Sequence, residues 1–332
     1  MNMSHFVLLP EKRTLPLYPN PYWTAVGSNR FCVRNITVHA RARCRGNPIS
    51  HQTQLRGRLN EAMENPPDAN GIEVLSLTRR FNSLVAVDHL TFSCASGATF
   101  GLLGPNGAGK STLIKMLTTL LPPSEGTAKI AGCDLVEHPE AVRRKIGYVS
   151  QMLSADGDLT GYENLLISAK LYGMSRSERV RGIAQALEFM ELAHVGGKLV
   201  RQYSGGMIRR LEIAQSMLHR PSVLFLDEPS VGLDPSAKRA VWERIAELRR
   251  EFGTTILMTT HDMEEADRLC DMVAVMHRGV LAAMDKPEAL KAQVGPEATM
   301  DDVFIHFTGA TISEGGELRD AARTRITAQR LG

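Results

Sequence analysis

The sequence has 332 residues, of which 43% are hydrophobic and 23% charged, a composition typical of a soluble globular protein with a sizeable core. No apolar run approaches the roughly 18 residues that cross a bilayer, so we expect no direct membrane span. The net charge of +3 hides two unlike parts: residues 1–70 carry nine Lys/Arg against four Asp/Glu, and residues 71–332 carry thirty against thirty-two. A near-neutral body lacks the concentrated basic face that nucleic acid requires, so we expect no nucleic-acid partner.

Residues 1–70 show no sustained periodicity and contain seven prolines. We expect a poorly ordered basic N-terminal extension, because such a segment buries too little apolar surface to fold. Two alternatives stay open. The arginine-leaning, acid-poor segment also suits a targeting peptide, although FVLLP is too short for a secretory signal, and an upstream start would make Met63 the true first residue.

From Gly71 the pattern changes to strands that alternate with helices. IEVLSL at 72–77 alternates as a half-buried strand does, and LVAVDHLTFSCASG at 84–97 has similar β content. STLIKMLTTLL at 111–121 has helical spacing. Buried apolar strands are predicted in GATFGLL at 97–103, PSVLFLDEP at 221–229 and TTILMTTHD at 254–262. This order indicates an α/β fold with a mainly parallel sheet and function at the carboxyl ends of its strands.

A mostly helical stretch at about 158–220 includes YENLLISAKLYG and VRGIAQALEFMEL. We expect it to form a helical subdomain inserted into the α/β core. Past Gly279, VLAAM predicts a strand, and helical spacing continues to about Gly309. The chain is therefore divided into the extension at 1–70, a main domain at 71–308 and a polar C-terminal tail at 309–332.

The segment GPNGAGKS fits the P-loop pattern in full and lies between a predicted strand and a predicted helix. Its glycines let backbone N–H groups converge on the β- and γ-phosphates, and the following helix presents its positive end. Lys110 is expected to reach these phosphates and Ser111 to ligate Mg²⁺. The loop predicts binding of a nucleoside triphosphate. The candidate phosphate ligands are Gly104, Pro105, Asn106, Gly107, Ala108, Gly109, Lys110, Ser111 and Thr112.

Two acids follow the predicted strand VLFL. In a P-loop sheet, an acid at the place of Asp227 completes the Mg²⁺ shell, usually through water. Glu228, one residue further on, is placed to polarise the attacking water as a general base. The alternative is a solvated strand end, because Asp-Glu-Pro also favours a turn.

Taken together, these motifs resemble the ATP-binding subunits of ABC transporters. The resemblance covers about 71–308 and rests, in chain order, on GPNGAGKS, Gln151 in IGYVSQ, YSGGM, LFLDEP, VGLD at 231–234 and His261. YSGGM in place of LSGGQ, and MDDVFIHFTG near the C-terminus, are most similar to the daunorubicin-resistance-like drug exporters. The resemblance implies a P-loop NTPase core with an antiparallel β subdomain and an inserted helical subdomain, and hydrolysis of ATP with Mg²⁺.

The resemblance also implies roles for three single residues. Gln151 corresponds to a glutamine that senses Mg²⁺ and the γ-phosphate, and His261 to a histidine that contacts the γ-phosphate. Their alternatives are a polar strand end and a structural histidine. Phe81, twenty-three residues before Gly104, corresponds to an aromatic that stacks on adenine, and its alternative is a core phenylalanine.

The second glycine-rich segment, Ser204-Gly205-Gly206, precedes a stripe of apolar residues at helical spacing, namely Met207, Leu211, Ala214 and Leu218. The segment is therefore predicted at a helix N-terminus, where free N–H groups and the positive helix end make a second γ-phosphate site. A plain turn that opens a helix is the alternative.

By the resemblance, each ATP lies between Lys110 of one chain and Ser204 of another, and Asp234 couples the two sites. One set of motifs per chain implies a second nucleotide-binding subunit, most simply a homodimer. Met207 replaces the more usual glutamine of this motif, but it lies past the phosphate-binding backbone, so we expect hydrolysis to survive.

The leading hypothesis is a motor that drives a separate membrane permease. The resemblance to the subfamily suggests that the transported compound is a drug or lipid-like substrate and that it is exported. The chain would be cytoplasmic and peripheral on the inner face of the membrane. Its cysteines (Cys32, Cys44, Cys94, Cys133 and Cys270) fit neither zinc nor disulfide spacing, in agreement with a reducing compartment.

The runner-up is an ABC ATPase of a ribosomal or DNA-repair machine, although such proteins carry two motif sets or long insertions. A P-loop kinase would not explain YSGGM or the paired acids.

Overall fold

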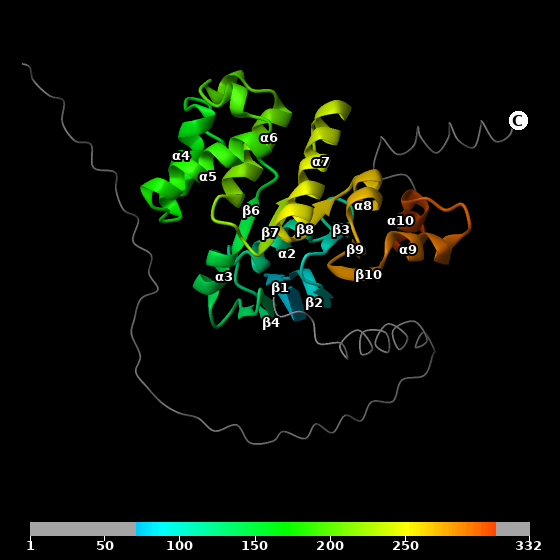
Figure 1. Ribbon diagram of the computed structural model, residues 1–332. Coiled ribbons are helices and arrows are strands. Elements are labelled where there is room, and N and C mark those ends of the chain that lie inside the picture. Colours follow the sequence, from blue (N-terminus) through cyan, green and yellow to red (C-terminus); the bar gives the residue numbers. More distant parts are fainter. Residues whose placement is uncertain (1–70, 310–332) are drawn as a thin grey trace, which may run out of the picture. The chain divides into compact units, whose positions relative to one another are not determined.

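The computed structural model describes residues 71–309, which belong to the second of the two units, Met1–His51 and Gln52–Gly332, into which the chain divides (Figure 1). The predictions for the extension at 1–70, for Met63 and for the tail beyond Gly309 lie outside the described residues. The described part holds two sheets and a set of helices, and it confirms the predicted fold class.

Within residues 71–309, a six-stranded sheet runs in the order β10-β9-β3-β8-β7-β6. Its strands are parallel except β10, which pairs antiparallel with β9. Every residue of β3, β7 and β8 is buried, because both faces of the sheet are covered. The three predicted buried strands are therefore confirmed. The strands are β3 (Thr99–Leu103), β6 (Ile146–Val149), β7 (Val223–Asp227), β8 (Thr255–Thr260), β9 (Met272–His277) and β10 (Val280–Asp285).

The second sheet is antiparallel, in the order β2-β1-β4-β5. Its strands are β1 (Ile72–Phe81), β2 (Leu84–Cys94), β4 (Glu125–Ile130) and β5 (Cys133–Asp134). One hydrophobic core joins this sheet, through the helix α2 (Lys110–Leu117), to one face of the main sheet. On β7, Val223 and Phe225 belong to this core, whereas Leu224 and Leu226 belong to the core on the other face, as the alternation of strand side chains requires.

Helix α2 ends earlier than its sequence predicts. Helical spacing extends to residue 121, but the helix stops at Leu117. Thr119 adopts a left-handed conformation with φ 61°, and Leu120 is 63% exposed. The chain therefore leaves the helix before the last leucines of the apolar pattern.

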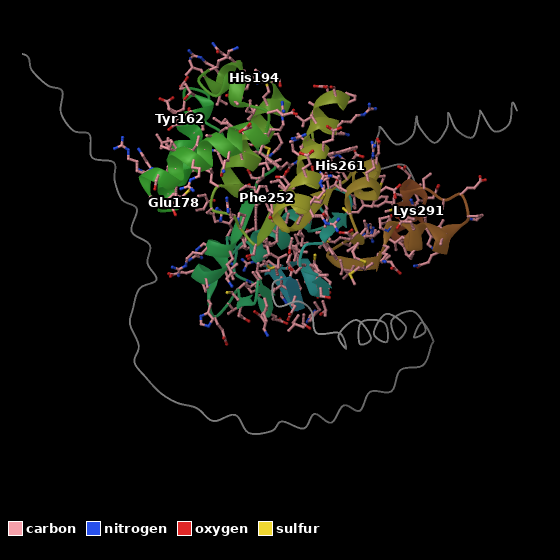
Figure 2. The ribbon with its side chains drawn as sticks, in the orientation of Figure 1. Tyr162, Glu178, His194, Phe252, His261 and Lys291 are labelled. Atoms are coloured by element: carbon pink, nitrogen blue, oxygen red, sulfur yellow. The ribbon has the colours of Figure 1, made fainter. Side chains whose placement is uncertain are left out.

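The predicted helical stretch forms helices α4 (Gly161–Leu171), α5 (Arg176–Phe189) and α6 (Gly205–Met217), with short 3₁₀ turns η1 (Ala193–Val195) and η2 (Val200–Gln202). Thr160 and Ser175 begin α4 and α5 with capping boxes, in which the side chain at the helix start and a glutamate three residues later each bind the other's backbone N–H. In Figure 2 the labels Tyr162, Glu178 and His194 lie on this helical part, and the label His261 lies outside it.

The other helices cover the main sheet or follow it. They are α3 (Pro139–Lys145), α7 (Pro235–Phe252), α8 (Met263–Leu269), α9 (Pro287–Val294) and α10 (Met300–Thr308). The strand predicted in VLAAM is β10, and α9 and α10 confirm the helical pattern behind it. Among the helices at residues 71–309, none combines the length and apolar character that a membrane crossing needs.

Candidate functional site

The first glycine-rich segment, residues 104–109, joins the buried end of β3 to the start of α2. Gly109 immediately precedes this helix with φ 105°, and a Cβ there would lie 2.3 Å from the carbonyl oxygen of Ala86. Only glycine fits this conformation and this close approach. Ser111 and Thr112 lie in the first turn of α2. The loop and the N-terminal end of α2 thus have an arrangement suited to binding phosphate groups.

Lys110 is the first residue of α2, and its side chain is 5% exposed. Its Nζ donates hydrogen bonds to the carbonyl oxygens of Gly104 at 2.7 Å and Pro105 at 3.2 Å, and it lies 3.4 Å from Oε1 of Glu228. Burial lowers the pKa of Lys110, and the charge of Glu228 opposes this shift. A buried ammonium therefore stands between the phosphate loop and an acid at the end of β7.

Ser111 and Asp227 meet at the carboxyl end of the main sheet. The Ser111 hydroxyl donates to Oδ1 of Asp227 at 3.3 Å, and Thr259 on β8 donates to the same oxygen at 2.6 Å. A hydroxyl beside a carboxylate is a donor set that fits Mg²⁺. Among the described residues, no group of three or more His, Cys, Asp or Glu is arranged to hold a metal ion.

Glu228 is the point where the predicted catalytic residues converge. Its Oε2 accepts a hydrogen bond from Nε2 of Gln151 at 3.0 Å and lies 3.3 Å from Nδ1 of His261, while Oε1 faces Lys110. The backbone of Glu228 has φ 49°, and its N–H donates to both the carbonyl and the hydroxyl oxygen of Thr259. The structure thus places the Gln151 amide on Glu228 and not on the Ser111–Asp227 pair.

The hydrogen bond with His261 is the main cause that lowers the pKa of Glu228, and the same bond raises the pKa of His261. Glu228 is therefore a carboxylate at neutral pH, held among three nitrogen-bearing side chains. Such a group can accept a proton from a water molecule that it orients.

The Glu228–His261 pair predicts that stability depends on pH. The folded pKa of His261 is raised, so its contribution is fully present below the unfolded histidine pKa of about 6.5 and is lost as the pH rises through the folded value. We expect His261→Ala to lower the urea midpoint more at pH 6 than at pH 9. Circular dichroism at both pH values measures this. His194→Ala, on η1, is the control, and an equal effect of His261→Ala at both pH values would contradict the expectation.

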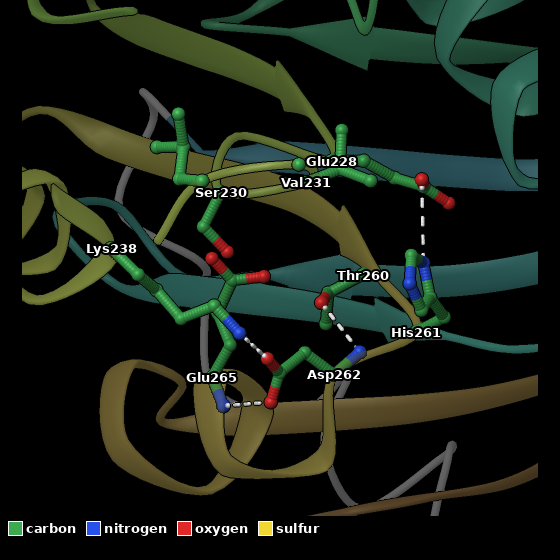
Figure 3. Close-up of a pocket in the computed structure, with 10 residues that line it drawn as sticks. Glu228, Ser230, Val231, Lys238, Thr260, His261, Asp262 and Glu265 are labelled. Carbon is green, nitrogen blue, oxygen red and sulfur yellow. Dashed lines mark hydrogen bonds and ion pairs between the residues drawn. The ribbon is translucent and has the colours of Figure 1, made fainter. Parts of the chain in front are cut away.

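A cavity of about 90 Å³ lies beside Glu228 and His261 (Figure 3). Asp262 forms an ion pair with Lys238 from α7, and its backbone N–H donates to the Thr260 hydroxyl at 2.9 Å. Glu265 is 1% exposed and accepts a hydrogen bond from Nε1 of Trp242 at 2.7 Å. These polar contacts join the segment after β8, and the helix α8, to α7. Sequence reasoning missed the Lys238–Asp262 and Trp242–Glu265 pairs, because the two partners of each pair lie more than twenty positions apart.

The second glycine-rich segment begins α6, as predicted. Ser204 is the N-cap, and its hydroxyl accepts the N–H of Met207 at 3.3 Å. A Cβ on Gly206 would lie 2.7 Å from that of Ala237 on α7, so glycine allows the two helices to approach. Ser204 and Gly205 are exposed. Between residues 71 and 309, no recorded hydrogen bond or ion pair joins this segment to Lys110 or Glu228.

Two further candidates lie at the edges of the site. Asp234 is the N-cap of α7, where its Oδ1 accepts the N–H groups of Ser236 and Ala237, both at 3.0 Å. Phe81 ends β1 and is 40% exposed, with the guanidinium of Arg79 4.6 Å from its ring centroid. The alternative that Phe81 is a core residue is therefore wrong.

Residues 87–231 match the family model described as ABC transporter. The chain is 42% identical over 231 residues to the daunorubicin/doxorubicin resistance ATP-binding protein DrrA of Streptomyces peucetius, a match that covers 70% of each chain. It is 37% identical over 256 residues to the Nod factor export ATP-binding protein I of Sinorhizobium fredii, covering 77% of this chain and 74% of that protein.

Solved structures show the same fold. An ATP-binding subunit of an ABC transporter has a TM-score of 0.64 and 30% identity, covering 72% of this chain and 99% of that chain. An ATP-binding cassette in a dimeric post-hydrolysis state, bound to ADP and Pi, has a TM-score of 0.58 and 24% identity. The match covers 65% of this chain and 98% of that chain. The second likeness shows the fold alone.

Proposed function

Because the chain belongs to the ABC transporter family and is one of its ATP-hydrolysing subunits, we propose that it powers export of a drug or lipid-like compound through a separate membrane permease. The observation that carries the hydrolytic part of this proposal is the convergence of Lys110, Gln151 and His261 on Glu228. The names of the relatives support the cargo class, because they describe drug resistance and Nod factor export.

ATP binding is proposed to use the backbone N–H groups of residues 104–109 and the first turn of α2. Nζ of Lys110 would exchange its carbonyl partners for the β- and γ-phosphate oxygens. Phe81 is exposed at the end of β1, as a residue that stacks on adenine must be. Ser111 and Asp227 would hold Mg²⁺, which would neutralise charge that develops on the phosphates, and Gln151 would join them only by giving up its hydrogen bond to Glu228.

Hydrolysis is proposed to use Glu228 as the general base. A water molecule attacks the γ-phosphorus while Glu228 accepts its proton, and the bond from the γ-phosphorus to the bridging oxygen breaks to release ADP and phosphate. Gln151 and His261 hold the carboxylate at 3.0 and 3.3 Å and so fix its direction. Preorganised charge of this kind needs no rearrangement during the reaction.

The working unit is proposed to be a homodimer. The N-terminus of α6, where Ser204 and Gly205 are exposed and Gly206 is buried, would bind the γ-phosphate of an ATP held by the partner, and Asp234 would link the two sites. ATP closes the dimer if the closed form binds ATP more tightly than the open form does, and hydrolysis reopens it if the closed form binds ADP much less tightly than ATP. The permease would hold the subunit at the cytoplasmic face of the membrane.

The test of the permease proposal uses the Glu228→Gln variant, which we expect to retain ATP in a closed dimer. We would purify it with ATP and Mg²⁺ from detergent-solubilised cells and identify the proteins that accompany it by mass spectrometry. A polytopic membrane protein in near-stoichiometric amount is expected, and Lys110→Ala is the matched control that should lose ATP. Ribosomal or DNA-repair proteins with no membrane partner would contradict the proposal.

A further inference from the structure

Helix α6 contains two oppositely charged residues, Arg209 and Glu212, that are buried although their sequence pattern is also compatible with a solvent-exposed face. Arg209 is 2% exposed and Glu212 4%, and Nη1 of Arg209 lies 3.0 Å from Oε2 of Glu212. Nε of Arg209 has no hydrogen-bond partner among the described residues. Burying an ion pair costs desolvation that the mutual attraction often fails to recover. The pair is therefore poorly explained as a device for stability.

The contacts of the pair point to one short segment, residues 150–154. Arg209 donates from Nη1 to the carbonyl oxygen of Ser150 at 2.7 Å and from Nη2 to that of Gln151 at 2.9 Å. Oε1 of Glu212 accepts the backbone N–H of Ser154, and also its hydroxyl at 3.2 Å. The two side chains thus bind main-chain groups on both sides of an otherwise exposed stretch, in which Met152 is 80% exposed.

The segment held in this way carries Gln151, whose side chain reaches Glu228 at 3.0 Å. The helix that holds it starts at Ser204, Gly205 and Gly206. The helix α6 therefore connects two parts of the site. Its first turn carries the second glycine-rich segment, and residues of its second turn bind the backbone of the Gln151 segment. Neither Arg209 nor Glu212 touches Glu228 or the phosphate loop.

We propose that Arg209 and Glu212 are positioning residues that clamp the Gln151 segment to α6, so that the glutamine amide and the N-terminus of α6 move as one body. The inference rests on the proposed roles of Gln151 and Glu228 and deepens them. When a phosphate shifts α6, the clamp carries Gln151 with it. The ATP site of one chain thereby responds to what binds at the exposed end of α6.

The test replaces both charges at once, because removing one alone would leave the other buried and unpaired. In Arg209→Met/Glu212→Leu we expect a thermal midpoint close to that of the native protein. The kcat for ATP should fall about 10- to 100-fold, the size typical of a misplaced catalytic group, with little change in KM. Arg210→Met is the matched control, because Arg210 lies on the same helix but binds Met190 and Glu191 instead. It should keep the native kcat.

Two further readouts separate the clamp from a structural role. Hydrogen–deuterium exchange at residues 150–154 should become faster in the double variant and stay unchanged in Arg210→Met. Adding Gln151→Ala to the double variant should cost little more, because the clamp acts through Gln151. Unchanged exchange, or an additive loss of kcat, would overturn the inference. A native kcat in Gln151→Ala alone would instead overturn the proposed role of Gln151, and with it the catalytic part of the clamp.

Discussion

Glu228→Gln should lower the kcat for ATP by about 10²- to 10⁴-fold, the range that general-base catalysis contributes. The amide keeps the shape of the side chain but cannot accept the proton of the attacking water. It can still accept a hydrogen bond from Gln151 or His261, so the fold should be retained. Release of phosphate by the purified protein at saturating ATP measures the rate.

The matched control is Glu265→Gln, which also alters a buried carboxylate of the same region but lies on α8, away from the phosphate loop. It should retain most of the native kcat. ATP binding to Glu228→Gln, measured by equilibrium dialysis, should be as tight as native binding or tighter. A rate close to native in Glu228→Gln would show that another group accepts the proton.

The second large effect concerns the proposed division of each ATP site between two chains. Lys110→Ala should remove nucleotide binding, because the buried ammonium beside residues 104–109 is lost. Ser204→Asp keeps an N-cap for α6 but places a negative charge where the partner's γ-phosphate is expected. Homodimers of either variant should be inactive, since each of their sites carries one lesion. Ser175→Asp, at the N-cap of α5, is the control for the second change and should stay active.

The local features of this protein are encoded in short stretches and could be predicted. The strands that end at Asp227 and Thr260 follow from short apolar runs that stop at polar residues, and the start of α6 follows from Ser204 before an apolar stripe. The phosphate loop follows from spacing alone. Each of these signals lies within about ten residues of chain.

The side-chain contacts of the site could not be predicted in this way. Gln151 and His261 reach Glu228 only because β6, β7 and β8 are neighbours in the main sheet, and the order of strands is a property of the whole fold. Arg209 and Glu212 resemble an ordinary surface pair three residues apart, and only the position of residues 150–154 buries them. The early end of α2 is accompanied by a left-handed backbone at Thr119, which the apolar pattern does not indicate.

The central claim, that each ATP is hydrolysed between two copies of the chain, is tested most directly with two purified heterodimers of equal composition. One combines Lys110→Ala with Ser204→Asp, and the other combines the native chain with a chain carrying both substitutions. If the sites are shared, the first heterodimer holds one intact site and hydrolyses ATP, whereas both sites of the second are damaged. Activity in the second heterodimer alone would contradict the claim, because each site would then lie within one chain.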